Sequence, residues 1–198
     1  DVGRFNAAPE GAVVPVSPET AEVVRAALGW ARNSGGVFDP CLGGLSELWD
    51  PGWTTTDFPE RDLPEPERVA ALADRHLWQG VEVTGTLDDP ALRKLDADAR
   101  LDLGGIAKGY AVDRAAAVLV GHGVFRGLLN VGGDLMALGD GPGGRAWRIG
   151  VRDPRAPERI ATTLEVTDAA VATSGDYLRG FIAEGERWHH LLDPLTGR

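Results

Sequence analysis

The sequence predicts an α+β fold in which helices and strands are mixed along the chain. Amphipathic helical patterns occur at 18–34, 66–77 and 106–120. Short runs of strand-forming residues follow one another closely after residue 127, as neighbouring strands of antiparallel sheets do. Because helices do not alternate regularly with these strands, a doubly wound parallel sheet is disfavoured.

The first helix is predicted by its two ends and by its apolar face. Ser17 can cap the helix, Pro18 fits its first turn and Glu19 adds a negative charge there. Apolar residues recur on one face at Val24, Ala27, Leu28 and Ala31. The Gly35-Gly36 pair is then expected to stop the helix.

The remaining elements are predicted from the same signals. A short helix is expected at 42–48, and an exposed segment rich in Pro, Thr and acidic residues separates it from the helix at 66–77. Trp49 and Trp53, near the start of that segment, are expected to cover the core. The predicted strands lie at 81–86, 93–96, 101–103, 127–131, 135–138, 147–151, 160–166 and 170–173.

Length and composition are those of a folded, acidic protein. The 198 residues are 43% hydrophobic, enough to bury a core as one domain or as two small lobes. A net charge of −10 disfavours nucleic acid and anionic membrane surfaces as partners, because both repel an acidic protein. No run of about 18 apolar residues predicts a membrane span. Cys41 is the only cysteine, so it excludes an intrachain disulfide and is interpreted as a small buried residue.

The residues most typical of a binding site lie at 101–109, where a predicted strand leads into a predicted helix. Asp102, the Gly104-Gly105 pair and Lys108, one of two lysines in the chain, lie within seven residues of one another. Glycines let a backbone approach a ligand closely, and a helix N-terminus offers unpaired N–H groups to an anion, so a phosphate-bearing ligand is favoured. From this segment alone, the alternative that it is an ordinary strand-to-helix junction with a solvated lysine stays open. Gly109 excludes a Walker A loop, which needs Ser or Thr at that position.

Four motif segments, in order, resemble those of the ApbE-type FAD:protein FMN transferases. They are GGVFDP at 35–40, DLGGIAKGYAVD at 102–113 with NVGGD at 130–134, TSGDY at 173–177, and HHLLDPLTG at 189–197. The resemblance implies an ApbE-like, T-fold-related α+β fold with two lobes, mixed or antiparallel sheets and packed helices, formed by residues 1–198 as a single domain. It also implies that the family's sequence starts before Asp1 and continues beyond Arg198.

The resemblance also assigns roles to individual residues. It implies that Asp102 and Lys108 contact FAD, and that the main-chain carbonyl of Gly105 is a ligand of Mg²⁺, an ion that prefers oxygen. It implies that residues of the first motif line the flavin or adenine part of FAD, namely Gly36, Val37, Phe38 and Asp39. Two further magnesium ligands are expected from an Asp-x-x-x-Thr motif beyond Arg198.

The two late motifs supply the remaining candidates. His189 and His190 are consecutive, so on a strand they point to opposite faces and are not expected to share a metal ion. The resemblance places one of them near the FAD pyrophosphate; His190 is favoured, with Leu191 also at the cofactor. Ser174 is interpreted as a binding or structural residue, because its surroundings do not match a nucleophile elbow. Asp176 is interpreted as a positioning carboxylate, and either Asp176 or His190 is the expected catalytic base.

The activity implied by the resemblance is Mg²⁺-dependent transfer of FMN from FAD to a threonine hydroxyl of a target flavoprotein, with release of AMP. Two alternatives stay open: a FAD pyrophosphatase, in which water replaces the threonine, and a non-catalytic flavin-binding module. The expected partners are FAD and an acceptor protein. By analogy with similar proteins, the protein is expected to be exported and to act at the cell envelope.

Overall fold

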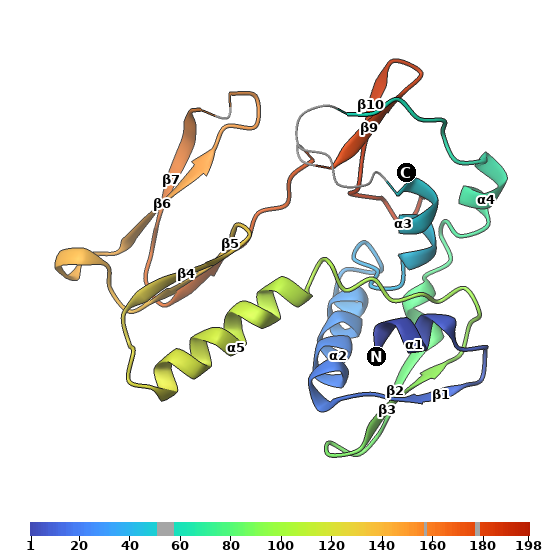
Figure 1. Cartoon of the computed structure of the whole chain (residues 1–198), viewed down its shortest axis with the longest axis horizontal. Helices are drawn as coiled ribbons and strands as arrows, with labels where there is room; N and C mark the ends of the chain where they lie inside the picture. The colour runs from blue at the N-terminus through green and yellow to red at the C-terminus, as the bar shows by residue number, and fades with distance from the viewer. Residues whose placement is uncertain (51–57, 157, 177–178) are drawn as a thin grey trace. The chain divides into compact units, whose positions relative to one another are not determined.

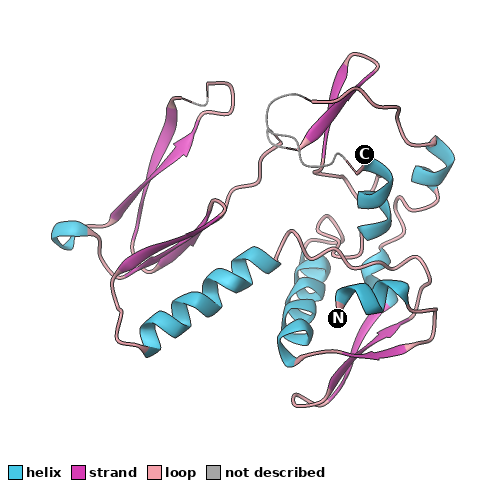
Figure 2. Cartoon of the chain, viewed as in Figure 1, coloured by secondary structure: helices cyan, strands magenta, loops and turns pink. Residues whose placement is uncertain are grey.

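The chain divides into two compact units, each with its own elements. The computed structural model describes residues 1–50, 58–156, 158–176 and 179–198. The first unit comprises residues 1–105 and 176–198, and the second comprises residues 106–175. Helices and antiparallel sheets occur in both units (Figure 1; Figure 2), which confirms the predicted α+β class.

The first unit is built on a three-stranded antiparallel sheet of order β1-β3-β2 and a separate hairpin of β9 and β10. Helix α2 packs against β2 and β3. The elements of this unit are α1 (Val2–Ala7), β1 (Val13–Pro15), α2 (Pro18–Asn33), α3 (Gly43–Trp49), α4 (Pro66–Ala70), the 3₁₀ helix η1 (Leu77–Gly80), β2 (Val81–Gly85), β3 (Pro90–Lys94), β9 (Gly180–Ala183) and β10 (Glu186–His189).

The second unit contains an antiparallel sheet of order β4-β5-β8 and a separate hairpin of β6 and β7. Helix α5 packs against β4 and β5. The elements are α5 (Ala107–Gly121), β4 (Gly127–Val131), β5 (Asp134–Leu138), the 3₁₀ helix η2 (Pro142–Gly144), β6 (Trp147–Arg152), β7 (Ile160–Val166) and β8 (Ala169–Val171). The predicted strands of this region are confirmed to within a residue or two at each end.

Both ends of α2 are as the sequence predicts. The side chain of Ser17 accepts a hydrogen bond from the Thr20 N–H at 3.1 Å, which satisfies one of the free N–H groups of the first turn. At the other end, the Gly36 N–H donates to the Ala31 carbonyl at 2.8 Å, and the Gly35 N–H donates to the Arg32 carbonyl at 3.2 Å. Both glycines have positive φ, so this is the Schellman arrangement that ends many helices.

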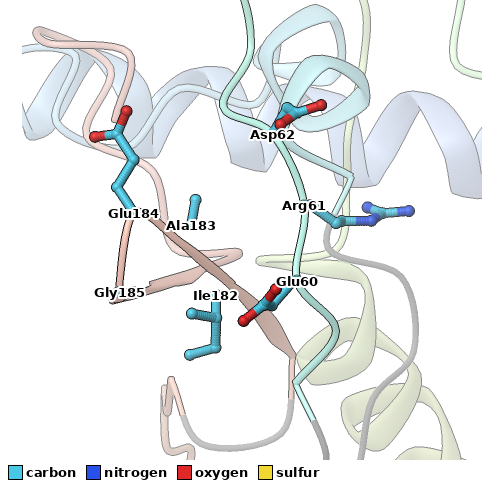
Figure 3. Close-up of a pocket in the computed structure, with 7 residues that line it drawn as sticks. All are labelled: Glu60, Arg61, Asp62, Ile182, Ala183, Glu184 and Gly185. Carbon is cyan, nitrogen blue, oxygen red and sulfur yellow. The ribbon is translucent and has the colours of Figure 1, made fainter.

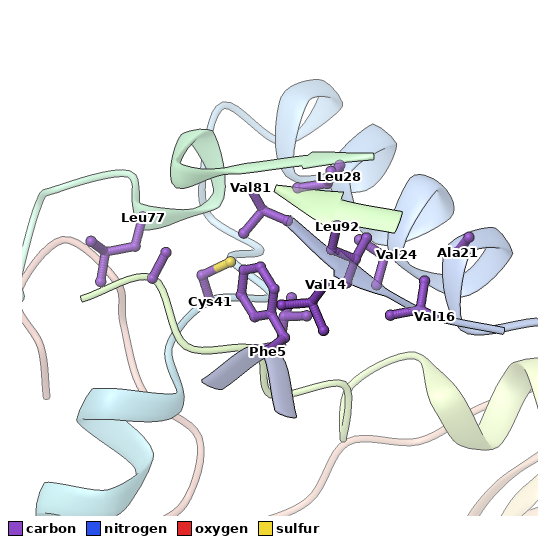
Figure 4. Close-up of a cluster of buried hydrophobic side chains, with 12 residues drawn as sticks. Phe5, Val14, Val16, Ala21, Val24, Leu28, Cys41, Leu77, Val81 and Leu92 are labelled. Atoms are coloured by element: carbon purple, nitrogen blue, oxygen red, sulfur yellow. The ribbon is translucent and has the colours of Figure 1, made fainter. Parts of the chain in front are cut away.

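The first unit has two apolar cores. The larger lies between α1, α2 and the sheet (Figure 4), and its labelled members include Phe5, Val24, Cys41 and Leu92, all with 0% exposure. The smaller core lies between α3, α4 and the β9-β10 hairpin, with Leu45, Trp49, Val69, Phe181 and Ala183 buried. Burial of this apolar surface is the main stabilising contribution available to these short elements.

The burial of Trp49 and Cys41 agrees with expectation. Trp49 is 4% exposed and belongs to the smaller core, whereas Trp53 lies outside the described residues. Burial raises the pKa of the Cys41 thiol, so this cysteine packs as an unreactive apolar group. No helix in the described part of the chain is long and apolar enough to cross a membrane.

The prediction of a helix at 66–77 is wrong beyond Ala70, where α4 ends. The Asp74 N–H donates to the carbonyl of Pro194 at 2.9 Å, so it is not available to continue the helix toward the Ala70 carbonyl. Asp74 also has a φ of 56°, in the left-handed region. A contact from the far end of the sequence therefore overrides the helical pattern.

Two strand predictions also need correction. The strand predicted at 93–96 is β3, Pro90–Lys94, because a tight turn after Gly85 pairs that residue with Pro90 and fixes the register. Residues 101–103 form no strand. The backbone N–H and carbonyl of Leu101 are instead bonded to the side-chain amide of Asn6, at 2.7 and 2.9 Å.

We expect Ser17→Ala to lower the free energy of unfolding by about 1 kcal/mol, because it leaves the Thr20 N–H without its capping oxygen. Ser17→Asn should retain most of the stability, since Asn caps helices as well as Ser does. Urea unfolding of the three proteins measures the difference. Equal midpoints for Ser17→Ala and the parent chain would show that the cap contributes nothing.

Candidate functional site

The segment that leads to Asp102 lies against the start of α3. The Gly43 N–H donates to the Arg100 carbonyl at 2.8 Å, and the Asp102 N–H donates to the Pro40 carbonyl at 2.8 Å. A Cβ atom at position 43 would lie 2.6 Å from the Arg100 carbonyl oxygen, closer than real Cβ atoms come. Only glycine therefore permits this approach at residue 43.

Two hydrogen bonds hold the carboxylate of Asp102. The Ser46 hydroxyl, on α3, donates to Oδ2 at 2.8 Å. The Gly104 N–H donates to Oδ1 at 2.9 Å. Each oxygen keeps a free lone-pair direction, and the residue is exposed. The structure thus presents Asp102 as an oriented, solvent-facing acceptor.

The first motif comes directly to this turn. A Cβ atom at Gly105 would lie 3.0 Å from Cε2 of Phe38, so the Phe38 ring covers the glycine. Val37 beside it is 69% exposed. Residues predicted to bind FAD and Mg²⁺ from sequence positions far apart are therefore neighbours in this unit.

The other two residues of the first motif face inward. Gly36 is buried, and a Cβ atom there would lie 2.5 Å from Nδ1 of His76. Asp39 is 7% exposed and accepts hydrogen bonds from the N–H groups of Cys41 at 2.8 Å and Trp78 at 3.3 Å. Burial raises the pKa of the Asp39 carboxyl, against the opposing effect of these donors. Asp39 therefore holds the loop from inside, while Val37 is exposed and Phe38 lies half-buried against Gly105.

The late motifs gather around the β9-β10 hairpin. Asp176 forms an ion pair with Arg187 of β10. His190 directly follows β10, and its Nδ1 lies 3.5 Å from the carbonyl oxygen of Arg179. Asp176 is near enough to act electrostatically on His190. The two residues predicted as alternative bases are thus both at the same end of this hairpin.

The environment of His190 favours the neutral imidazole. Burial lowers the pKa of His190, and the charges of Arg179 and His189 add to this effect. The Arg179 carbonyl and Asp176 oppose it. A neutral ring has one nitrogen free to accept a proton, as a general base requires.

The histidine pair does not form a metal site with other ligands. Within the ranges that the structure describes, no three His, Cys, Asp or Glu side chains gather as metal ligands would. His189 lies half-buried with its Nδ1 unbonded to any described atom. That the two imidazoles do not share an ion stays a prediction.

The last motif forms a self-bonded turn attached to α3. Asp193 accepts bonds from the Leu195 N–H at 2.9 Å and the Thr196 hydroxyl at 3.1 Å. Trp49 Nε1, at the end of α3, donates to the Gly197 carbonyl at 2.6 Å. Leu191, between His190 and this turn, is 40% exposed. The same helix that bonds to Asp102 thus also holds the end of the chain.

Lys108 and Ser174 belong to the second unit. The Lys108 ammonium lies 3.4 Å from Oδ2 of Asp134, and the lysine side chain is 51% exposed. This pair joins the two segments of the predicted signature, at 102–113 and 130–134. Helix α5 begins with no side chain capping its first N–H groups, which keeps them available for an anion. Ser174 is exposed.

A separate hollow of about 460 Å³ lies along β9 (Figure 3). It forms because residues 59–61 run beside β9, with hydrogen bonds of 2.9 Å from Ile182 to Pro59 and from Arg61 to Ile182. Its lining includes Glu60, Asp62 and Glu184. Three carboxylates against one arginine make it unsuitable for a diphosphate, and none of the predicted site residues lines it.

Comparison with known proteins agrees with the motifs. The model of the ApbE family matches residues 1–198. The chain belongs to the ApbE family. The FAD:protein FMN transferase of Treponema pallidum is 35% identical over 206 residues, which cover 99% of this ApbE chain and 56% of that protein.

Solved ApbE structures confirm the ApbE-like fold. The crystal structure of the ApbE protein of Thermotoga maritima matches with a TM-score of 0.85 and 34% identity, over 99% of this chain and 61% of that one. The apo form of the Pseudomonas stutzeri flavinyl transferase ApbE matches with a TM-score of 0.79 and 33% identity, over 100% and 59%. The ApbE chain described here thus spans about three fifths of each of these two structures.

Sequence reasoning missed two residues that the geometry brings to the site. Ser46 contacts Asp102 from 56 positions away, and no local signal marks it. Asn6 bonds to both backbone groups of Leu101, next to Asp102.

We expect His190 to titrate below the ordinary histidine value of about 6.5, because burial disfavours its charged form. The unfolded chain then binds the proton first, so acidification through pH 6.5 lowers the free energy of unfolding. NMR titration of the imidazole, assigned with His190→Gln, measures the pKa. A value at or above 6.5 contradicts the burial argument.

Proposed function

We propose that this ApbE chain supplies the FAD-binding and catalytic residues for transfer of FMN from FAD to a protein threonine. The observation that carries the proposal is the Asp102 turn. Its exposed carboxylate is oriented by Ser46 and Gly104, and Phe38 of the first motif packs on Gly105. The names of the relatives, FAD:protein FMN transferase and flavinyl transferase, support the same activity.

In the proposed reaction, the threonine hydroxyl oxygen attacks the phosphorus of the FMN half of FAD. A new P–O bond forms, the bond from that phosphorus to the AMP oxygen breaks, and AMP leaves. Such transfers depend mainly on positioning and on neutralising charge. Asp102 anchors FAD through its free acceptor positions. Lys108 donates to phosphate: its half-exposed ammonium has three donors, and the ion pair with Asp134, at 3.4 Å, leaves it open to a second anion.

His190 is the proposed base that accepts the threonine proton. Its burial keeps the imidazole neutral, which leaves a nitrogen able to accept. The Asp176 carboxylate is already engaged by the Arg187 guanidinium. Asp176 therefore fits a positioning role beside His190, and the choice that the sequence left open favours the histidine.

Mg²⁺ fits the exposed turn at 102–105 as an ion shared with substrate. Gly105 and Asp102 are exposed oxygen donors of the kind that Mg²⁺ prefers, and magnesium commonly keeps water and phosphate oxygens in its shell. When bound, the ion neutralises pyrophosphate charge. The Gly105 carbonyl is the proposed protein ligand. The proposal includes export of the protein itself, which would then act on its acceptor flavoprotein at the cell envelope.

Lys108→Ala should weaken FAD binding by about 1.5–3 kcal/mol, the range for hydrogen bonds to charged groups. Arg114→Ala is the matched control, because it removes one exposed positive charge from the same helix. Lys94 is unsuitable as a control, since it is 1% exposed. Titration calorimetry with FAD measures the three affinities. If Lys108→Ala and Arg114→Ala weaken FAD binding equally, the loss comes from the change in net charge and not from a direct contact of Lys108 with phosphate.

Incubation of the chain with FAD, Mg²⁺ and a threonine-bearing acceptor protein tests the reaction. We expect little turnover from residues 1–198 alone. A longer chain that includes the expected Asp-x-x-x-Thr motif should release AMP and give in-gel flavin fluorescence of the acceptor, and should lose both when Mg²⁺ is chelated. His190→Gln should lower the rate by about 100-fold or more, the usual contribution of a general base. AMP with free FMN and an unlabelled acceptor would indicate a pyrophosphatase. Binding of FAD without either product would indicate a binding module.

A further inference from the structure

The backbone that carries Asp102 is fixed by a residue 95 positions away from Leu101 in the sequence. The Asn6 side chain accepts from the Leu101 N–H at 2.7 Å and donates to the Leu101 carbonyl at 2.9 Å. This two-point contact replaces a strand neighbour for Leu101, which is itself 3% exposed. The residue before Asp102 therefore has both backbone groups satisfied by one side chain.

A buried lysine holds Asn6 in turn. Lys94 is 1% exposed, and its ammonium donates to the Asn6 carbonyl at 3.2 Å. The ammonium also lies 5.5 Å from the centre of the Phe5 ring, which favours a cation over its face. Burial lowers the pKa of Lys94. This chain of contacts fixes the main chain at 101 but leaves the Asp102 side chain free to rotate.

Helix α3 supplies the missing constraint on that side chain. Ser46 donates to Oδ2 of Asp102, and the next residue, Glu47, forms an ion pair of 2.5 Å with Arg100. Gly43 lies against the same segment through its N–H. Three points of contact thus hold α3 beside residues 100–102. The Ser46 hydroxyl is placed by the helix rather than by a flexible loop, which gives it a defined direction.

We propose that Ser46 is a positioning residue for FAD binding, because its hydroxyl orients the Asp102 carboxylate toward the ligand. The inference rests on the proposed contact between Asp102 and FAD. Without Ser46, the Gly104 N–H is the remaining bond to the carboxylate among the described residues. Rotation about the Asp102 side chain then becomes easier, and part of the binding free energy is spent on restoring the orientation.

A double-mutant cycle with FAD as the probe tests this inference. The proteins are the parent chain, Ser46→Ala, Asp102→Ala and the double variant, each measured by titration calorimetry after urea unfolding has shown that it is folded. We expect Ser46→Ala to weaken FAD binding about 5- to 10-fold in the parent chain, a loss of the size that a typical hydrogen bond contributes, because the Gly104 N–H still holds the carboxylate. In the Asp102→Ala background it should change the affinity less than about 2-fold, because the group it acts through is gone.

Two further variants separate positioning from a merely structural role. Ser46→Thr retains the hydroxyl and should restore affinity to within about 2-fold of the parent chain. Thr84→Val is the matched control, since it removes a hydroxyl on β2 that donates to the Ala91 carbonyl of β3 and should leave FAD affinity unchanged. Equal effects of Ser46→Ala in both backgrounds, or failure of Ser46→Thr to rescue, overturn the inference. An unchanged affinity in Asp102→Ala, or no FAD binding by the parent chain, overturns the proposed function instead.

Discussion

The close approach of α3 to residues 100–102 is the constraint on which the first unit's candidate site depends. It is possible because Gly43 has no side chain to meet the Arg100 carbonyl, which would lie 2.6 Å from a Cβ atom. Once the helix is there, Ser46 reaches Asp102, and Glu47 reaches Arg100. A larger residue at 43 would move the helix and separate all of these pairs together.

The same short helix connects the middle of the sequence with its end. Ser46 and Trp49 are three residues apart, so they lie on one face of α3. Ser46 bonds to Asp102, while Trp49 stacks on Trp188 with ring centres 5.0 Å apart and bonds to the Gly197 carbonyl. Trp188 is two residues before His190. Helix α3 therefore contacts both the turn proposed to bind the ligand, through Ser46, and the strand that leads to the proposed base, through Trp49.

The elements that the sequence predicted well are those fixed by local chemistry. The ends of α2 follow from Ser17 and from the Gly35-Gly36 pair, and β4 follows from its own residues at 127–131. The family resemblance assigned Asp102 and Phe38 to FAD and Gly105 to Mg²⁺, and the structure brings Phe38 against Gly105. The end of the helix predicted at 66–77 and the missed role of Ser46 have another cause: Asp74 bonds to Pro194, and Ser46 bonds to Asp102. Contacts between residues 56 or more positions apart leave no periodic pattern that could reveal them.

Consecutive residues of the first motif have different structural roles. Val37 is exposed and Phe38 is half-buried against Gly105, whereas Asp39 is buried and bonds to backbone N–H groups on two segments. A buried carboxylate is costly unless such donors compensate it, and this compensation makes its position sensitive to the segments that donate. Asp39 thereby ties the loop after α2 to η1, and the orientation of Phe38 over Gly105 depends on that tie. A motif that resembles a ligand-binding segment therefore contains both the residues that meet a ligand and the residues that hold them in place.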